Sequence, residues 1–243
     1  MRKKGIFVLY EAVYDNVRIR PLEQKDIEQL RIWRNDSSKT KFLRPIGMIT
    51  PSKQLEWFEE YQKATDEIIF AIEEIKEFNQ IVGSLGIYHI NGETAEIGKI
   101  QIGEEKANGR GIGKKSMVIA LKIGFEKMGL KKIVGSVNPQ NIPAYKNDMK
   151  IGFKVVGSHV CSEGIEEEIQ IDWESLIFAN SYLGEIIVQE YRDSLSWGGN
   201  KKRKVYIVDA KRRAIGKFGG TLKKISCGVR RKTKVWRKNS RRA

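Results

Sequence analysis

The segment from residue 96 to 128 reads as a strand, a glycine-rich loop and a long helix, and this junction limits the folds open to the chain. Apolar alternation predicts a strand over 96–102, Asn108-Gly-Arg-Gly-Ile-Gly113 forms the loop, and an amphipathic run follows. Backbone N–H groups at a helix N-terminus lack helical partners and carry the positive end of the helix dipole. A pyrophosphate can therefore bind there, and glycines let it approach closely.

Three glycine-rich motifs compete for this loop, and their spacing separates them. A P-loop would need a glycine where Asn108 stands. A dinucleotide-binding loop starting at Gly109 would need its third glycine at Lys114. What remains resembles the acyl-CoA loop of the GNAT superfamily of N-acyltransferases, Arg/Gln-x-x-Gly-x-Gly/Ala, which Gly111 and Gly113 satisfy. Asn108 departs from the usual Arg or Gln of that family.

A second motif, about 30 residues further on, resembles the same superfamily. The family has Asn-x-x-Ala-x-x-Leu-Tyr-x-Lys-x-Gly-Phe at this place. Five residues of the chain fall in register with it: Asn141, Ala144, Lys150, Gly152 and Phe153. Two motifs in the right order and at the right separation are a specific signal, whereas a glycine loop alone would also suit an ordinary helix start.

Hydrophobic periodicity predicts an element order that matches this family over residues 15–175. The predicted strands cover 17–20, 68–73, 81–90, 95–102, 132–138, 153–159 and 167–173, and the predicted helices 24–34, 51–61, 111–128 and 141–150. The resemblance implies an α/β fold with a mixed, mostly antiparallel sheet of about seven strands and about four flanking helices. Asn91-Gly92 is predicted to be a hairpin turn.

Charge separates the end of the chain from the rest. Residues 200–243 hold 18 basic residues and one acid, whereas the preceding residues are nearly neutral in sum. Residues 204–220 resemble the N-terminus of a thiolase, without any later thiolase element. We interpret 198–243 as a basic, disordered tail that binds nucleic acid without sequence preference, arising either from an accidental gene fusion or as an evolved basic arm.

Three further segments complete the predicted organisation. Residues 1–14 are expected to be an N-terminal extension, 15–175 the acyltransferase domain, and 176–197 a terminal helix or a linker. The two cysteines indicate no disulfide framework, and no apolar run approaches the length of a membrane span. The sequence therefore predicts a soluble cytoplasmic protein without a membrane partner. The two histidines, far apart in sequence, predict no metal site.

The resemblance implies acetyl-CoA as co-substrate, and its amine acceptor must lose a proton before attack. Glu96 is the candidate general base. Strict alternation places it with Ile100 and Ile102, in an apolar setting that would raise its pKa. Two alternatives are that Glu96 merely pairs with Lys99 or another neighbour, and that Gly98 marks a bulge that re-aims the strand.

The remaining chemical roles are also carried over from the family. The predicted acetyl-CoA contacts are Ile100, Gln101, Ile102, Asn108, Gly109, Arg110, Gly111, Ile112, Gly113, Lys114 and Asn141. Asn141 is equally suited to be a helix N-cap. The family's proton-donating Tyr falls on Asp148, whose ordinary pKa of about 4 would keep it ionised. Tyr145, one turn earlier, is therefore the favoured acid. Alternatively, water protonates the thiolate and Asp148 helps to hold a cationic acceptor.

The acceptor is suggested only by the first two predicted helices. Leu30-Arg-Ile-Trp-Arg-Asn-Asp36 and Glu56-Trp57-Phe58 resemble the N-terminal helices of two subgroups, the nucleotide-sugar amine acetyltransferases of the pseudaminic-acid type and the acetyltransferases of ribosomal-protein N-termini. This resemblance implies that Trp33, Arg34 and Asn35 bind the acceptor, although such helical positions are more often core. The leading hypothesis is a small amine such as a nucleotide-linked amino sugar. The alternatives are a protein N-terminus and a non-catalytic CoA-binding module.

Overall fold

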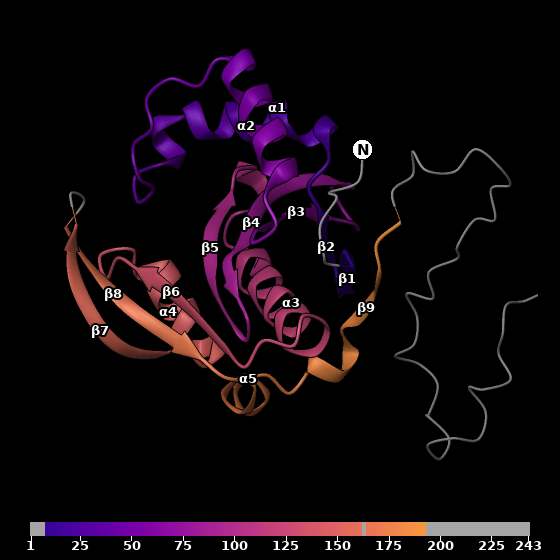
Figure 1. Cartoon of the computed structure of the whole chain (residues 1–243), viewed down its shortest axis with the longest axis vertical. Coiled ribbons are helices and arrows are strands. Elements are labelled where there is room, and N and C mark those ends of the chain that lie inside the picture. The colour runs from indigo at the N-terminus through magenta and orange to yellow at the C-terminus, as the bar shows by residue number, and fades with distance from the viewer. Residues whose placement is uncertain (1–7, 162–163, 193–243) are drawn as a thin grey trace, which may run out of the picture. The chain divides into compact units, whose positions relative to one another are not determined.

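One sheet of nine strands organises the computed structural model, which describes residues 8–161 and 164–192 (Figure 1). The strands follow the order β7-β8-β6-β5-β4-β3-β2-β1-β9 across the sheet. Their bounds are β1 (Tyr10–Tyr14), β2 (Val17–Pro21), β3 (Ile68–Glu74), β4 (Gln80–Asn91), β5 (Thr94–Ile102), β6 (Lys132–Val137), β7 (Lys154–Cys161), β8 (Gly164–Ile171) and β9 (Ile187–Glu190). β5 and β6 run parallel, and the other neighbouring strands run antiparallel.

Five α-helices lie in the described part of the chain. They are α1 (Ile27–Asn35), α2 (Pro51–Lys63), α3 (Ile112–Lys127), α4 (Ile142–Ile151) and α5 (Trp173–Ala179). Thr50 caps α2 and Asn141 caps α4, each by accepting a backbone N–H with its side-chain oxygen. The predicted mixed, mostly antiparallel sheet with flanking helices is thus confirmed, with nine strands instead of seven. Among the described helices, none is both long and apolar enough to cross a membrane.

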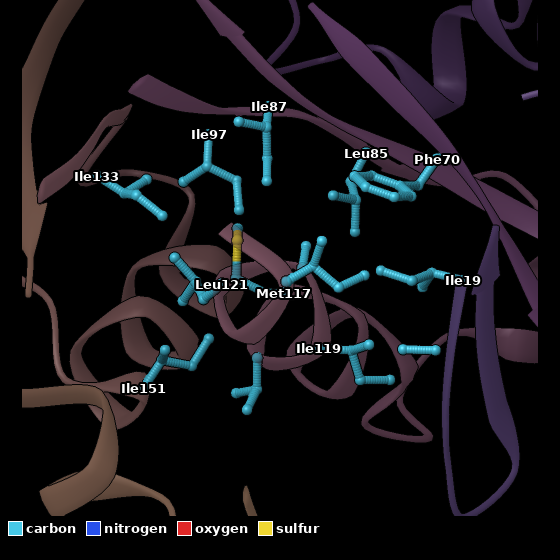
Figure 2. Close-up of a cluster of buried hydrophobic side chains, with 14 of the residues drawn as sticks. Ile19, Phe70, Leu85, Ile87, Ile97, Met117, Ile119, Leu121, Ile133 and Ile151 are labelled. Carbon is cyan, nitrogen blue, oxygen red and sulfur yellow. The ribbon is translucent and has the colours of Figure 1, made fainter. Parts of the chain in front are cut away.

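The main hydrophobic core lies between α3 and one face of the sheet. Figure 2 shows side chains from the central strands pointing toward Met117, Ile119 and Leu121 of α3. The labelled strand residues are Ile19, Phe70, Leu85, Ile87, Ile97 and Ile133. Ile151 of α4 joins the same cluster, so α4 lies on the α3 side of the sheet. Burial of this apolar surface is the main stabilising contribution to the fold.

The opposite face of the sheet is covered by α1 and α2 at β3. A second cluster contains Leu22, Ile27, Phe58, Tyr61, Ile69 and Ala71. Along β3, Ile69 and Ala71 face these two helices, whereas Phe70 and Ile72 face α3. This alternation follows from the two-residue period of a strand that is buried on both faces.

The two ends of the domain differ from the sequence prediction. Residues 10–14, expected within an N-terminal extension, form β1 inside the sheet. The segment expected as a terminal helix or linker instead contains the end of α5 and then β9, which pairs with β1 from Tyr10↔Glu190 onward. Such pairing joins residues that are far apart in sequence, so no local periodicity reveals it.

The predicted basic tail lies outside the described residues, and the last described strand ends at Glu190. Deletion of residues 198–243 therefore removes no described element of the sheet. We expect the shortened chain to keep its melting temperature and turnover. The full chain should retain DNA in a filter-binding assay at low salt and lose it at high salt. Binding of the basic tail to DNA is driven by the release of counterions from the phosphates, and added salt weakens this driving force. A shortened chain that fails to fold would show that the tail belongs to the domain.

Candidate functional site

β5 and β6 separate at Glu96. The two strands pair only from Thr94↔Lys132 to Glu96↔Val134, although β5 continues to Ile102. Beyond Glu96, β5 is paired only with β4 among the described strands. The edge of β5 that faces β6 therefore has backbone groups without a strand partner there. Backbone N–H donors at such an edge can bind the carbonyl oxygen of a bound thioester.

A β-bulge at Lys99 changes the direction of the side chains in β5. Gly86 pairs with Gly98 and Ser84 with Gln101, so that Lys99 and the next residue lie opposite a single residue of β4. Lys99 has a φ of 51°, a conformation that residues other than glycine rarely adopt. The bulge predicted as an alternative at Gly98 is therefore present, one residue later than Gly98 itself.

The bulge overturns the expected surroundings of Glu96. Ile100 and Ile102 pack against the α3 core, the face to which Ile97 also points. Glu96 alternates with Ile97 and therefore lies on the opposite face of the sheet. Its side chain is 41 % exposed, and its Oε1 atom lies 3.0 Å from Nδ1 of His89. The apolar setting that strict alternation predicted for Glu96 is thus absent.

Several ionisable side chains surround the Glu96–His89 pair. Lys99 binds Glu67 at 2.6 Å instead of Glu96, and its ammonium lies 4.5 Å from the centroid of the Tyr88 ring. Burial, and next the charge of Glu96, raise the pKa of Tyr88 to about 12. Smaller electrostatic contributions at Tyr88 come from Arg44, Glu166 and Glu67. Groups from β5, β8, the α1–α2 connection and the residue before β3 therefore converge on this part of β4.

From the sequence, a metal site and a catalytic triad were both expected to be absent at His89 and His159, because the two histidines are far apart in the chain. A signal for the contact of His89 with Glu96 was nevertheless present in the predicted hairpin. Counting back from the Asn91-Gly92 turn, a regular hairpin pairs residue 91 with 94 and residue 89 with 96. In the structure a bulge shifts this register by one residue, so that Tyr88 pairs with Glu96 and His89 contacts it from the next position. In the described part of the chain, no group of three or more His, Cys, Asp or Glu side chains is arranged to hold a metal ion.

The glycine loop presents backbone groups at the start of α3. Gly109 and Gly111 both have a φ of 73°, and Gly111 is the N-cap of the helix without a side-chain cap. The first helical N–H to be paired is that of Lys115, which donates to Gly111 O at 3.0 Å. The preceding N–H groups, from residues 112 to 114, therefore remain available for an anion.

Side chains of the loop are largely engaged within the protein. Arg110 forms an ion pair with Glu77 and lies over the ring of Phe78, 5.0 Å from its centroid. Lys115 donates to both Asp15 and Asn16 at 2.7 Å. Asn108, whose identity departs from the family pattern, is exposed beside the loop. Lys114 has no ion pair among the described residues, so an anion at this loop could be held by the backbone N–H groups and by Lys114.

α4 places the two candidate acids in different settings. The Tyr145 hydroxyl forms a hydrogen bond with the Glu167 carboxylate, which raises the pKa of Tyr145. Asp148 is 8 % exposed, and burial raises its pKa to about 7. The ordinary pKa of about 4 that the sequence suggested for Asp148 is therefore too low, because burial by the surrounding elements is not visible in the sequence. Asn141 accepts the Ala144 N–H at 3.4 Å, which confirms its role as an N-cap.

The three predicted acceptor-binding residues hold α1 in place. Trp33 is buried, and its backbone carbonyl accepts a hydrogen bond from Gln101 at 3.2 Å. Arg34 donates to the backbone carbonyl of Arg44. Asn35 exchanges two hydrogen bonds with the backbone of residue 49, at 2.8 and 2.9 Å. These contacts tie the α1–α2 connection to the sheet, and a role in acceptor binding stays a prediction.

The glycine loop lies at the start of α3, where the resemblance placed it, and Glu96 lies where the parallel strands β5 and β6 separate. Residues 16–154 match the family described as acetyltransferase (GNAT) domain. The chain belongs to this family and is an acyltransferase, as the resemblance of its two motifs implied.

Individual relatives agree with this assignment. An uncharacterized N-acetyltransferase of Bacillus subtilis, YnaD, is 27 % identical over 140 residues, which cover 57 % of this chain and 79 % of that protein. A GNAT-family acetyltransferase structure from Bacillus anthracis is 26 % identical with a TM-score of 0.58, covering 68 % of this chain and 99 % of that one. The spermidine N-acetyltransferase from Vibrio cholerae, solved with CoA and spermine, has a TM-score of 0.61 at 19 % identity and covers 67 % of this chain and 98 % of that chain. This last likeness concerns the fold.

Proposed function

We propose that the chain transfers the acetyl group of acetyl-CoA to the primary amine of a small molecule. The observation that carries this proposal is the parting of β5 and β6 at Glu96. A thioester can enter between the strands there, with the glycine loop at one end and the Glu96–His89 pair at the other. Membership of the acetyltransferase family supports the same reaction.

In this proposal, acetyl-CoA binds with its pyrophosphate on the N–H groups at the start of α3. Both Ile100 and Ile102 lie close to Gly113, at the same end of α3. The thioester carbonyl would then reach the free edge of β5 near residues 100–102, where preorganised N–H donors stabilise the oxyanion. The Asn141 side chain keeps its amide N–H groups for the CoA arm, because only its oxygen is used by the cap.

Asp148 is the proposed donor of the proton to the leaving thiolate. With a pKa of about 7, this carboxyl is protonated in roughly half of the molecules at neutral pH. Tyr145, which the sequence favoured, has its hydroxyl engaged by Glu167 and a raised pKa, so its proton is harder to release. Tyr145 is therefore the second candidate for the same role.

The glycine loop provides a matched test of the acetyl-CoA site. Gly111→Ala and Gly109→Ala introduce the same methyl group at the same φ of 73°, with no atom within 4 Å of either new Cβ. Both variants should lose about 1 kcal/mol of stability, because a left-handed conformation is unfavourable for alanine. Only Gly111→Ala should also weaken acetyl-CoA binding, by about tenfold, because this glycine directly precedes the phosphate-binding N–H groups. Equal acetyl-CoA affinities for the two variants in a calorimetric titration would show that the pyrophosphate does not bind at the start of α3.

The acceptor is proposed as a small amine on the face of the sheet that carries Glu96. A nucleotide-linked amino sugar remains the candidate implied by the α1 motif. The charged groups near Tyr88 are the three carboxylates of Glu67, Glu96 and Glu166 and the two cations Arg44 and Lys99. The excess of negative charge favours an acceptor with positive charge, so spermidine is a second candidate. Thiol release from acetyl-CoA should be measured with three amines: a nucleotide-linked amino sugar, spermidine and a peptide with a free N-terminus. Release with the peptide alone would assign a protein N-terminus as the acceptor.

A further inference from the structure

A second bulge in the same hairpin determines the direction of His89. Tyr88 pairs with Glu96 and Asn91 pairs with Thr94, so two residues of β4 lie opposite Ala95. His89 has a φ of 50°, again in the left-handed region. In a regular strand, His89 would point to the α3 face, as Ile87 does. The bulge instead turns the imidazole toward the face that carries Glu96.

The contacts of His89 leave one ring nitrogen unused. Nδ1 lies 3.0 Å from Oε1 of Glu96, and the edge of the Tyr88 ring system packs against the imidazole with a centroid separation of 5.0 Å. The side chain is 68 % exposed, and within the described residues Nε2 has no hydrogen-bond partner. A carboxylate that accepts a hydrogen bond from Nδ1–H selects the tautomer whose Nε2 lone pair can take a proton.

We propose that His89 is the catalytic base that deprotonates the acceptor amine, and that Glu96 is the positioning residue that orients its imidazole. This inference rests on the acetyl transfer proposed above. It replaces the expectation that the Glu96 carboxylate takes the proton itself. The geometry is that of a carboxylate–imidazole pair, with Glu96 at the point where β5 and β6 separate.

The proton balance of the step is simple. The ammonium group of the acceptor gives one proton to Nε2 of His89, and the neutral amine then attacks the thioester carbonyl carbon. When the tetrahedral intermediate collapses, the C–S bond breaks and the sulfur leaves with the electron pair. The thiolate takes a proton from Asp148. The attacking nitrogen, which carries two protons in the intermediate, loses one of them to solvent, and solvent returns a proton to the Asp148 carboxylate. The exposed imidazolium of His89 releases its proton to water.

Asparagine is the replacement that separates the two roles, because it tolerates a positive φ but cannot take a proton at neutral pH. His89→Asn should lower kcat by at least about tenfold at neutral pH, as expected when a general base is lost. Part of this loss should disappear at high pH, where the amine is already neutral. Glu96→Gln should cost less, because glutamine can still accept the Nδ1–H bond. The double variant should match His89→Asn, because the two residues act in series.

The matched control is His159→Asn. His159 is the other histidine, lies on β7, and also faces two carboxylates, Glu166 at 3.6 Å and Glu168 at 3.4 Å. This variant should keep the wild-type kcat and pH profile. His89→Gly adds a second test, because glycine fits the bulge without strain. Added imidazole should restore part of its turnover, which a purely structural role of His89 would not allow.

All variants are compared in the thiol-release assay with acetyl-CoA and the panel amine that gives the highest wild-type turnover. The titratable and charged groups around the pair are Tyr88, the Lys99–Glu67 ion pair, Arg44 and Glu166. A His89→Asn variant with wild-type kcat and pH profile would overturn the assignment and return the proton transfer to Glu96. Absence of thiol release in the wild type with every panel amine would instead refute the proposed function, and the role of His89 with it.

Discussion

Asp148→Asn is expected to stabilise the folded chain at pH 8 while leaving its stability at pH 4 nearly unchanged. The folded-state pKa of Asp148 is raised by burial from 3.8 to about 7. Between these values the folded state binds more protons than the unfolded state, so stability falls as the pH rises. Above the folded pKa, the buried carboxylate lowers the free energy of unfolding by up to about 4 kcal/mol. Asparagine removes this charge but leaves one buried amide without a hydrogen-bond partner.

The control for this prediction carries the opposite sign. Asp172 caps α5 by accepting the Ser175 N–H at 2.8 Å, and its side-chain hydrogen bond to Ser175 lowers its pKa. Its stabilising contribution is present above the unfolded pKa and is lost as the pH falls. Asp172→Ala should therefore lose about 1 kcal/mol at pH 8. Urea unfolding of both variants at pH 4 and 8 measures the effect, and an Asp148→Asn variant less stable than wild type at pH 8 would show that its carboxylate is satisfied.

The same substitution also tests the acid. If Asp148 protonates the thiolate, Asp148→Asn should gain stability and lose turnover together, by up to about a hundredfold for a missing general acid. Tyr145→Phe should then have little effect on kcat. A Tyr145→Phe variant that loses turnover while Asp148→Asn keeps it would assign the proton to Tyr145. This pair therefore decides which residue of α4 takes the role that the family motif gives to tyrosine.

Gly103→Ala is expected to destabilise the domain by about 3 kcal/mol or more, because overpacking a buried ring forces the backbone to move. A Cβ atom at residue 103 would lie 2.0 Å from the Trp33 ring, and Trp33 is only 3 % exposed. Gly103 follows β5 directly, so the shift would separate α1 from the sheet beside the site. Gly86→Ala is the control, since its nearest contact is an ordinary 3.5 Å. Equal unfolding midpoints for the two variants in urea would mean that α1 is loosely packed at Trp33.

Local patterns in the sequence were sufficient for most of the fold. The strands and helices of residues 17–173 follow from two-residue and helical periodicity, and the caps at Thr50 and Asn141 from their hydroxyl and amide side chains. β1 and β9 could not be predicted in this way, because each is short and is defined by pairing with the other end of the domain. The glycine loop could be predicted because a φ of 73° favours glycine, so the conformation is visible in the sequence as Gly109 and Gly111.

The candidate site was less predictable because its geometry depends on two bulges at non-glycine residues. Lys99 and His89 adopt positive φ without any marker in their residue types. One bulge moves Glu96 away from the face of Ile100, and the other brings His89 to Glu96. The pKa of Asp148 depends on burial by surrounding elements, which a single-sequence motif does not contain. The chemistry of the site was therefore partly foreseen, and its assignment of roles was not.

Acetyl transfer is tested most directly by mass spectrometry of the amine panel after incubation with acetyl-CoA and the wild-type chain. We expect one panel amine to gain a single acetyl group in amounts equal to the CoA thiol released. We also expect the gain to be strongly reduced by His89→Asn and unaffected by His159→Asn. Tight binding of acetyl-CoA with no acetylated amine and no thiol release would contradict the account, and would leave a CoA-binding module without transferase chemistry.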